Sequence, residues 1–167
     1  MESIHEYRVE AIGAGGRNGV VHAEGILPAI SFSPPPEFQG ELGRWTPEHF
    51  LVAAVASCFI STFEGMAQTS RLEFNSLRLA AEGVLTKLDD SGWRFTEIRL
   101  RPTVTLRKEE DHHRAIRLLV IFQDCQPCAS DGKTASINGV RQFCLLCAFA
   151  AETDICAPRL KSFEVRA

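Results

Sequence analysis

The sequence lacks the features that mark a secreted, membrane-spanning or nucleic-acid-binding protein. Its first ten residues, MESIHEYRVE, have neither the basic start nor the apolar stretch of a signal peptide. No uninterrupted run of about 18 apolar residues occurs, so we expect no membrane-spanning helix. The net charge is −3, from 18 basic and 21 acidic side chains, which provides no basic excess for nucleic acid. These absences favour a cytoplasmic protein with no membrane or nucleic-acid partner.

Repeats, low-complexity tracts and long blocks of like charge are also missing. With 167 residues, 45% of them hydrophobic, the chain suits one globular domain with a substantial core. Six cysteines are present, and without a secretion signal a disulfide framework is not expected. We therefore interpret them as thiols, metal ligands or redox groups.

The clearest helix start is Thr46-Pro47-Glu48, where threonine caps free backbone N–H groups and proline suits the first turn. The next stretch, FLVAAVASCFISTF (residues 50–63), is apolar on almost every face, which predicts a buried helix. Its 14 residues are too few to cross a bilayer. We expect the central helix of a core, which two chains could share.

The rest of the chain predicts hairpins and a second helix. The expected strands are 7–12, 20–22, 26–32, 76–90, 93–109 and a short closing strand within 159–167, with tight turns at Asn18-Gly19 and Ser91-Gly92. Ile98, Leu100, Val104 and Leu106 alternate with polar residues, and Pro102 on their face argues for an edge or a bulge. The second helix is expected at 109–122, with Ile116, Leu119 and Val120 inward, and residues 129–140 form a loop. This order is typical of an α+β fold.

Several motifs occur in a specific order between residues 15 and 59. They are a glycine-rich turn with an arginine (GGRNG), a P-x-E-x-x-G loop (PPEFQG), a Pro-Glu helix start and a cysteine followed by phenylalanine. This segment closely resembles the OsmC/Ohr family, and the likeness covers roughly residues 7 to 122. The resemblance implies an OsmC-like α+β fold, with antiparallel sheets around long buried helices in an intertwined homodimer. The chain would be a single domain over 1–167, with an insertion around 123–143.

The resemblance also implies a chemistry, the thiol-dependent reduction of organic hydroperoxides without a cofactor. Cys58 matches the peroxidatic cysteine of the family, Arg17 its active-site arginine, and Glu48 the glutamate that orients that arginine. A second cysteine would form a disulfide with oxidised Cys58, and a lipoylated protein or a thioredoxin-type dithiol would reopen it. From the residues alone, Cys58 could equally be a small core side chain, Arg17 a solvated turn residue and Glu48 a helix-start carboxylate.

The resolving cysteine has three candidates. Cys144 is followed by the apolar stretch that the resemblance implies, Cys125 has the expected distance from the second helix, and Cys147 is a third choice. Together with Cys128, these residues also form the pattern C-x2-C-x15-C-x2-C, which suits structural zinc, although alanine follows each pair. A catalytically quiet OsmC-like protein and a zinc-stabilised binding protein therefore stay open as alternatives.

Four aromatic side chains near the expected site are interpreted as core or pocket-wall residues: Trp45, Phe59, Phe63 and Trp93. Under the peroxidase hypothesis, some of them would line an apolar funnel. Such a funnel would favour bulky organic peroxides over hydrogen peroxide.

Overall fold

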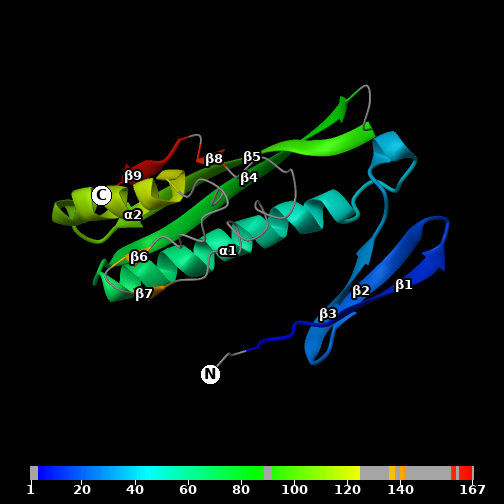
Figure 1. Cartoon of the computed structure of the whole chain (residues 1–167), viewed down its shortest axis with the longest axis horizontal. Helices are drawn as coiled ribbons and strands as arrows, with labels where there is room; N and C mark the ends of the chain where they lie inside the picture. Colours follow the sequence, from blue (N-terminus) through cyan, green and yellow to red (C-terminus); the bar gives the residue numbers. More distant parts are fainter. Residues whose placement is uncertain are drawn as a thin grey trace. The chain divides into compact units, whose positions relative to one another are not determined.

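The computed structural model describes residues 4–88, 92–124, 136–137, 140–141, 159–160 and 162–166 (Figure 1). The chain forms two compact units, residues 1–51 and 52–167. Its elements are α-helical and β-stranded, and the predicted α+β class is confirmed. The predicted insertion around 123–143 falls mostly outside the described residues, and the single-domain boundary stays a prediction.

The first unit contains a three-stranded antiparallel sheet in the order β1-β2-β3. Its strands are β1 (Val9–Gly15), β2 (Asn18–Ala23) and β3 (Ile26–Phe32), and a single 3₁₀ turn, η1 (Pro36–Phe38), follows them. The three strands confirm the expected N-terminal β-structure, with shifted bounds for β1 and β2.

The predicted tight turn at Asn18-Gly19 is wrong. The turn lies two residues earlier, at Gly16 and Arg17, which have φ angles of 58° and 68°. Asn18 already belongs to β2 and pairs with Gly15. Gly19 has a different role, because a Cβ atom there would lie 2.6 Å from the Phe32 ring. Close packing across the sheet therefore requires that glycine.

The central helix, α1 (Pro47–Thr69), begins where the sequence predicts. Thr46 is its N-cap, since the Thr46 hydroxyl accepts a hydrogen bond of 3.3 Å from the backbone N–H of His49. In return, Nδ1 of His49 accepts a hydrogen bond of 3.3 Å from the backbone N–H of Thr46. The two bonds satisfy donors at the helix start in the reciprocal manner of a capping box.

The length and burial of α1 differ from the expectation. The helix has 23 residues, and an 18-residue window has a mean hydropathy of 1.7, so it is long and apolar enough to cross a membrane. This corrects the expectation that no such segment exists, although the core helix of a soluble protein meets the same criteria. Only 28% of that window is buried, along one face that includes Val55, Phe59 and Phe63. The prediction of burial on every face is therefore wrong for the single chain.

Replacing Thr46 by alanine is expected to lower the free energy of unfolding by about 1 kcal/mol, because the cap of α1 is lost. Urea denaturation followed by circular dichroism measures this change. Thr69→Ala, at the exposed far end of the same helix, is the matched control and should change stability by less than about 0.5 kcal/mol. Equal losses in both variants would show that the cap contributes nothing.

The second unit is built on a long antiparallel hairpin, β4 (Phe74–Leu88) and β5 (Gly92–Leu106). β5 also pairs in parallel with the short strands β8 (Arg159–Leu160) and β9 (Glu164–Arg166). A 3₁₀ turn, η2 (Glu109–Asp111), leads into α2 (His112–Asp124). β6 (Ser136–Ile137) and β7 (Val140–Arg141) pair antiparallel, where a loop over 129–140 was expected.

The core of the second unit lies between one face of the hairpin and the two helices. The predicted alternation in β5 is confirmed, since Ile98, Leu100, Val104 and Leu106 are at most 2% exposed. The helices contribute Phe59, Phe63 and Met66 from α1, and Ala115, Leu118 and Leu119 from α2. Of the residues expected to point inward from α2, Leu119 is fully buried, whereas Ile116 and Val120 are half-buried.

Pro102 does not lie at an edge or at a bulge of the β4–β5 ladder. It pairs with Leu79 in the interior of the hairpin, and the ladder irregularities lie elsewhere. On its other side, β8 pairs with Arg99 and Leu100, and β9 pairs with residues from Thr103 onward. Neither set of pairs includes Pro102, which lies between the residues of β5 that pair with β8 and those that pair with β9. A missing N–H is tolerated at such a position, because no strand pairing there depends on it.

Candidate functional site

Cys58 lies on α1 at the border between its buried and exposed faces. Its neighbour Phe59 is fully buried, Ser57 is exposed, and Cys58 is half-buried against the hydrophobic core. The Sγ atom lies 3.9 Å from the hydroxyl oxygen of Thr62, one helical turn further on. Among the described residues it is the one cysteine. A thiol in this position combines apolar surroundings with access from one side.

Arg17 lies in the turn between β1 and β2, with an exposed side chain. Its Nη1 atom donates a hydrogen bond of 2.9 Å to the backbone carbonyl of Phe38. The next residue, Asn18, donates from Nδ2 to a carboxylate oxygen of Glu41 at 2.6 Å. Two neighbouring side chains therefore connect the glycine-rich turn to the proline-rich loop, which we define as residues 33–45.

The proline-rich loop has a tight backbone that fixes the position of the Phe38 carbonyl. The N–H groups of Phe38 and Gly40 both donate to the carbonyl of Pro35, at 2.9 and 3.1 Å. A Cβ atom on Gly40 would lie 1.6 Å from the carbonyl oxygen of Pro34, so no other residue fits there without a backbone shift. Gly40, the glycine of the P-x-E-x-x-G motif, is therefore needed for the close packing of the loop whose Phe38 carbonyl accepts the hydrogen bond from Arg17.

Glu48 lies in the first turn of α1, where a carboxylate is favourable to the helix dipole. Its Oε2 atom is buried and has no hydrogen-bond partner among the residues that the structure describes. Ten residues along one helix separate it from Cys58 by about 15 Å along the axis, so the two side chains do not touch. The described residues contain no ion pair between Arg17 and Glu48, and the implied pairing stays a prediction.

The remaining cysteine predictions lie outside the described residues. Cys144, Cys125 and Cys147, the candidate resolving residues, and Cys128 of the proposed zinc pattern all belong to this part of the chain. Across the described ranges, no group of three or more histidine, cysteine or acidic side chains is placed to hold a metal ion. The choice of resolving cysteine and the zinc hypothesis therefore stay predictions.

The four aromatic residues divide into two pairs. Phe59 and Phe63 are fully buried core residues, as expected. Trp45 and Trp93 are 46% and 52% exposed in the single chain, so neither is a core residue there, and their interpretation as pocket-wall residues stays a prediction. Trp45 instead stacks on Phe50, with ring centroids 5.5 Å apart.

Sequence reasoning missed two contacts of these candidate residues. Thr62 could have been found, because it lies four positions after Cys58 and therefore on the same side of a helix. The Phe38 carbonyl could not, because 21 positions separate it from Arg17 and a backbone acceptor leaves no signal in the sequence.

Comparison with known proteins identifies the family. A family model described as OsmC-like protein matches residues 39–128, more than half of the chain. The chain belongs to the OsmC-like protein family. The OsmC-like match begins just after η1 and covers α1 with Cys58, the long hairpin and α2.

Among curated proteins, the uncharacterized protein YmaD of Bacillus subtilis is 30% identical over 107 residues, which is 63% of this chain and 69% of YmaD. The OsmC-like protein of Mycoplasma pneumoniae has a similar structure, with a TM-score of 0.68 at 13% identity, over 98% of this chain and 99% of that one.

Two further structures carry hydroperoxide-resistance names. The organic hydroperoxide resistance protein OsmC of Legionella pneumophila gives a TM-score of 0.65 at 17% identity, over 99% of this chain and 100% of that one. OhrB of Bacillus subtilis, also an organic hydroperoxide resistance protein, gives 0.60 at 19% identity, over 98% and 100%. At these identities the likeness establishes the OsmC-like fold.

Proposed function

We propose that this OsmC-like protein is a thiol peroxidase that reduces organic hydroperoxides, with Cys58 as the reacting thiol. The observation that carries the proposal is the half-buried position of Cys58 on the border of α1, inside the segment that matches the family. The names of the Legionella and Bacillus relatives support peroxide resistance as the biological role.

The reaction balances with one peroxide and one dithiol. The Cys58 thiolate attacks the O–O bond, one oxygen becomes the sulfenic acid, and the other leaves as an alcohol after taking up a proton. A second cysteine thiol then displaces water from the sulfenic acid and forms a disulfide, for which Cys144 is the proposed residue. A lipoylated protein or a thioredoxin-type partner supplies two electrons and two protons to restore both thiols.

Arg17 is proposed to stabilise the thiolate, because an anion in apolar surroundings requires a nearby cation. Its exposed guanidinium donates to the Phe38 carbonyl through Nη1, and a guanidinium has five N–H donors, so others are available for a second partner. The buried Oε2 of Glu48, which has no hydrogen-bond partner among the described residues, is a suitable acceptor for that guanidinium. Because Glu48 and Cys58 lie about 15 Å apart along α1, a complete site would need Arg17 to bridge them, the helix to bend, or the second subunit to contribute.

We also propose that the active form is a homodimer in the cytoplasm. In the single chain, apolar side chains of the N-terminal sheet are exposed, with Val9 at 74%, Ile26 at 64% and Ile30 at 39%. A face of α1 with Ala54 and Ser57 is also exposed. A second copy would bury these surfaces, and sedimentation equilibrium is expected to give twice the mass of one chain.

The experiment that tests the function treats reduced, metal-free protein with one equivalent of cumene hydroperoxide and measures intact and peptide-mapped masses. We expect a loss of two hydrogens and a disulfide between Cys58 and Cys144. A disulfide from Cys58 to Cys125 or Cys147 would still support the peroxidase function and would identify that cysteine as the resolving residue. Unchanged mass, with an unmodified Cys58 in the presence of a sulfenic-acid trap, would overturn the proposal.

The role of Arg17 makes a separate prediction. Arg17→Gln is expected to lower the rate constant of Cys58 with cumene hydroperoxide by about 100-fold, because the cation proposed to stabilise the thiolate and the developing charge is lost. Arg44→Gln is the matched control, since Arg44 is another exposed arginine of the first unit, and its rate should stay within about twofold of the wild type. Stopped-flow measurement of thiol loss gives both rates.

A further inference from the structure

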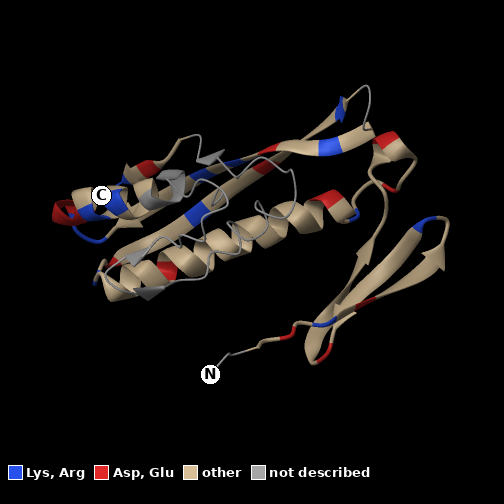
Figure 2. Cartoon of the chain, viewed as in Figure 1, with Lys and Arg blue, Asp and Glu red and all other residues tan. Residues whose placement is uncertain are grey.

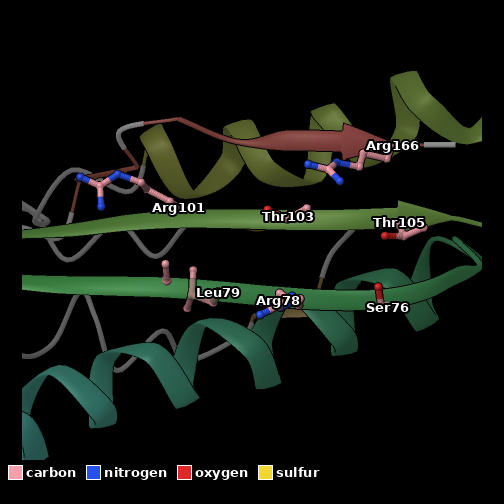
Figure 3. A pocket seen from close by; sticks show the side chains of 8 residues that line it. Ser76, Arg78, Leu79, Arg101, Thr103, Thr105 and Arg166 are labelled. Atoms are coloured by element: carbon pink, nitrogen blue, oxygen red, sulfur yellow. The ribbon is translucent and has the colours of Figure 1, made fainter.

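A pocket of about 470 Å³ lies on the long sheet, and of its lining residues only Leu79 also packs against the hydrophobic core (Figure 3). Hydroxyl-bearing and basic side chains dominate its lining. The polar residues are three hydroxyl-bearing and three arginine side chains: Ser76, Thr103, Thr105, Arg78, Arg101 and Arg166. Among the described residues that line it, none is acidic. The size is typical of small-ligand sites in proteins.

The strand register brings these side chains to one face. Arg78 on β4 pairs directly with Thr103 on β5, and Arg166 on β9 pairs with Thr105. Arg101 is two residues before Thr103 on the same strand, so it shares that face. Figure 3 shows Arg101 and Arg166 on opposite sides of Thr103, with Arg78 on the neighbouring strand. Arginines from β4, β5 and β9 therefore lie on the same face of the sheet as Thr103.

The three arginines of the pocket differ in their ion pairs with carboxylates. Arg101 forms an ion pair with Glu82 at 3.0 Å, and Arg166 forms one with Glu164 at 2.7 Å. The hydrogen bond from Arg166 lowers the pKa of the Glu164 carboxyl below its ordinary value, so that pair is ionised at neutral pH. No ion pair of Arg78 occurs within the described ranges, and its side chain is exposed. Basic segments on both long strands are visible in Figure 2.

We propose that this pocket binds a small phosphate-bearing molecule with two phosphate groups. Arginine binds phosphate oxygens through paired N–H groups, and the hydroxyls of Ser76, Thr103 and Thr105 supply further donors. Three arginines spread along the strands suit two phosphate groups better than one. A long polyanion is disfavoured, because the whole chain has a net charge of −3, whereas a small anion responds only to charges within about 8 Å.

The pocket is separate from the cysteine chemistry. Cys58 packs against the core with Leu77 and Val104, on the face of the hairpin that carries the alternating apolar residues. The arginine and hydroxyl side chains of the pocket alternate with these apolar residues along the strands, so they face the other side of the sheet. The ligand is thus bound on the opposite face of the sheet, and its binding does not depend on the proposed peroxidase function.

Isothermal titration calorimetry with pyrophosphate tests the proposal at an ionic strength of about 0.15 M, with inorganic phosphate as the one-phosphate probe. We expect a Kd for pyrophosphate below about 1 mM and weaker binding of phosphate. Arg78→Gln should weaken pyrophosphate binding at least about tenfold, because a charge-assisted pair is lost. Arg94→Gln is the matched control: it removes one exposed arginine from the same hairpin, outside the pocket, and should change Kd less than about twofold.

Three results would overturn the proposal. One is a Kd for pyrophosphate above about 1 mM with the wild-type protein. Another is equal weakening by Arg78→Gln and Arg94→Gln, which would show a general charge effect without a site. The third is tighter binding of a single-stranded oligonucleotide than of pyrophosphate, which would make the ligand a nucleic acid. Arg78 is exposed, so Arg78→Gln is expected to fold, and an unchanged circular dichroism spectrum verifies this.

Discussion

Replacing Cys58 by serine is expected to abolish the consumption of cumene hydroperoxide, with a loss of at least about 1,000-fold in rate. The reason is chemical, because a serine hydroxyl is not ionised at neutral pH and does not attack the O–O bond. The substitution changes one atom in a half-buried side chain, so the fold should be retained. Measurement of residual peroxide in the presence of a dithiol gives the rate for both proteins.

Ser57→Ala is the control for this substitution. Ser57 is the exposed neighbour of Cys58 on α1, and its hydroxyl donates to the backbone carbonyl of Ala54 at 3.0 Å. Its removal should leave the rate within about twofold of the wild type, as for most exposed substitutions. If Cys58→Ser consumed peroxide as fast as Ser57→Ala, another thiol would be the reacting group and Cys58 would be a core residue.

The largest loss of stability is expected from Phe63→Ala, at about 3 to 5 kcal/mol. Phe63 is fully buried, lies parallel to Phe59 at a centroid distance of 6.3 Å, and meets Phe74 edge-on at 5.8 Å. Truncation would leave a cavity among three aromatic rings and remove contacts between α1 and β4. Chemical denaturation at a fixed protein concentration measures the effect.

Leu42→Ala is the control for the core substitution. Leu42 is 86% exposed in the single chain, so its truncation should change stability by less than about 0.5 kcal/mol. A comparable loss for Leu42 would show that a surface exposed in one chain is buried in the assembled protein. That result would support the proposed homodimer and identify Leu42 as part of its interface.

The sequence predicted best those features that depend on local patterns. The alternation in β5 has a period of two residues, so Ile98 and Val104 were placed correctly in the core. The cap at Thr46 was also recognisable, because the residues that form it lie within three positions of each other. Cys58 was singled out by family resemblance, since a cysteine on an apolar helix has no distinctive pattern of its own.

Features that depend on tertiary contacts were predicted less well. The turn at Gly16-Arg17 was missed because Gly19, which resembles a turn glycine, is needed for contact with Phe32. The end of α1 was placed too early, because polar residues after Phe63 continue the helix on its exposed side. The hydrogen bond from Arg17 to Phe38 joins segments whose proximity appears only in the folded chain.

The division between the two compact units has a consequence for any attempt to separate them. It falls between Leu51 and Val52, inside α1, instead of in a linker. A fragment that began at Val52 would lack Thr46 and the first turn, which would leave new backbone N–H groups without partners at the truncated helix end. Helical backbone there also offers no extended segment for a protease. Domain shuffling or split-protein engineering at this boundary should therefore fail. We expect that neither unit folds when it is expressed without the other.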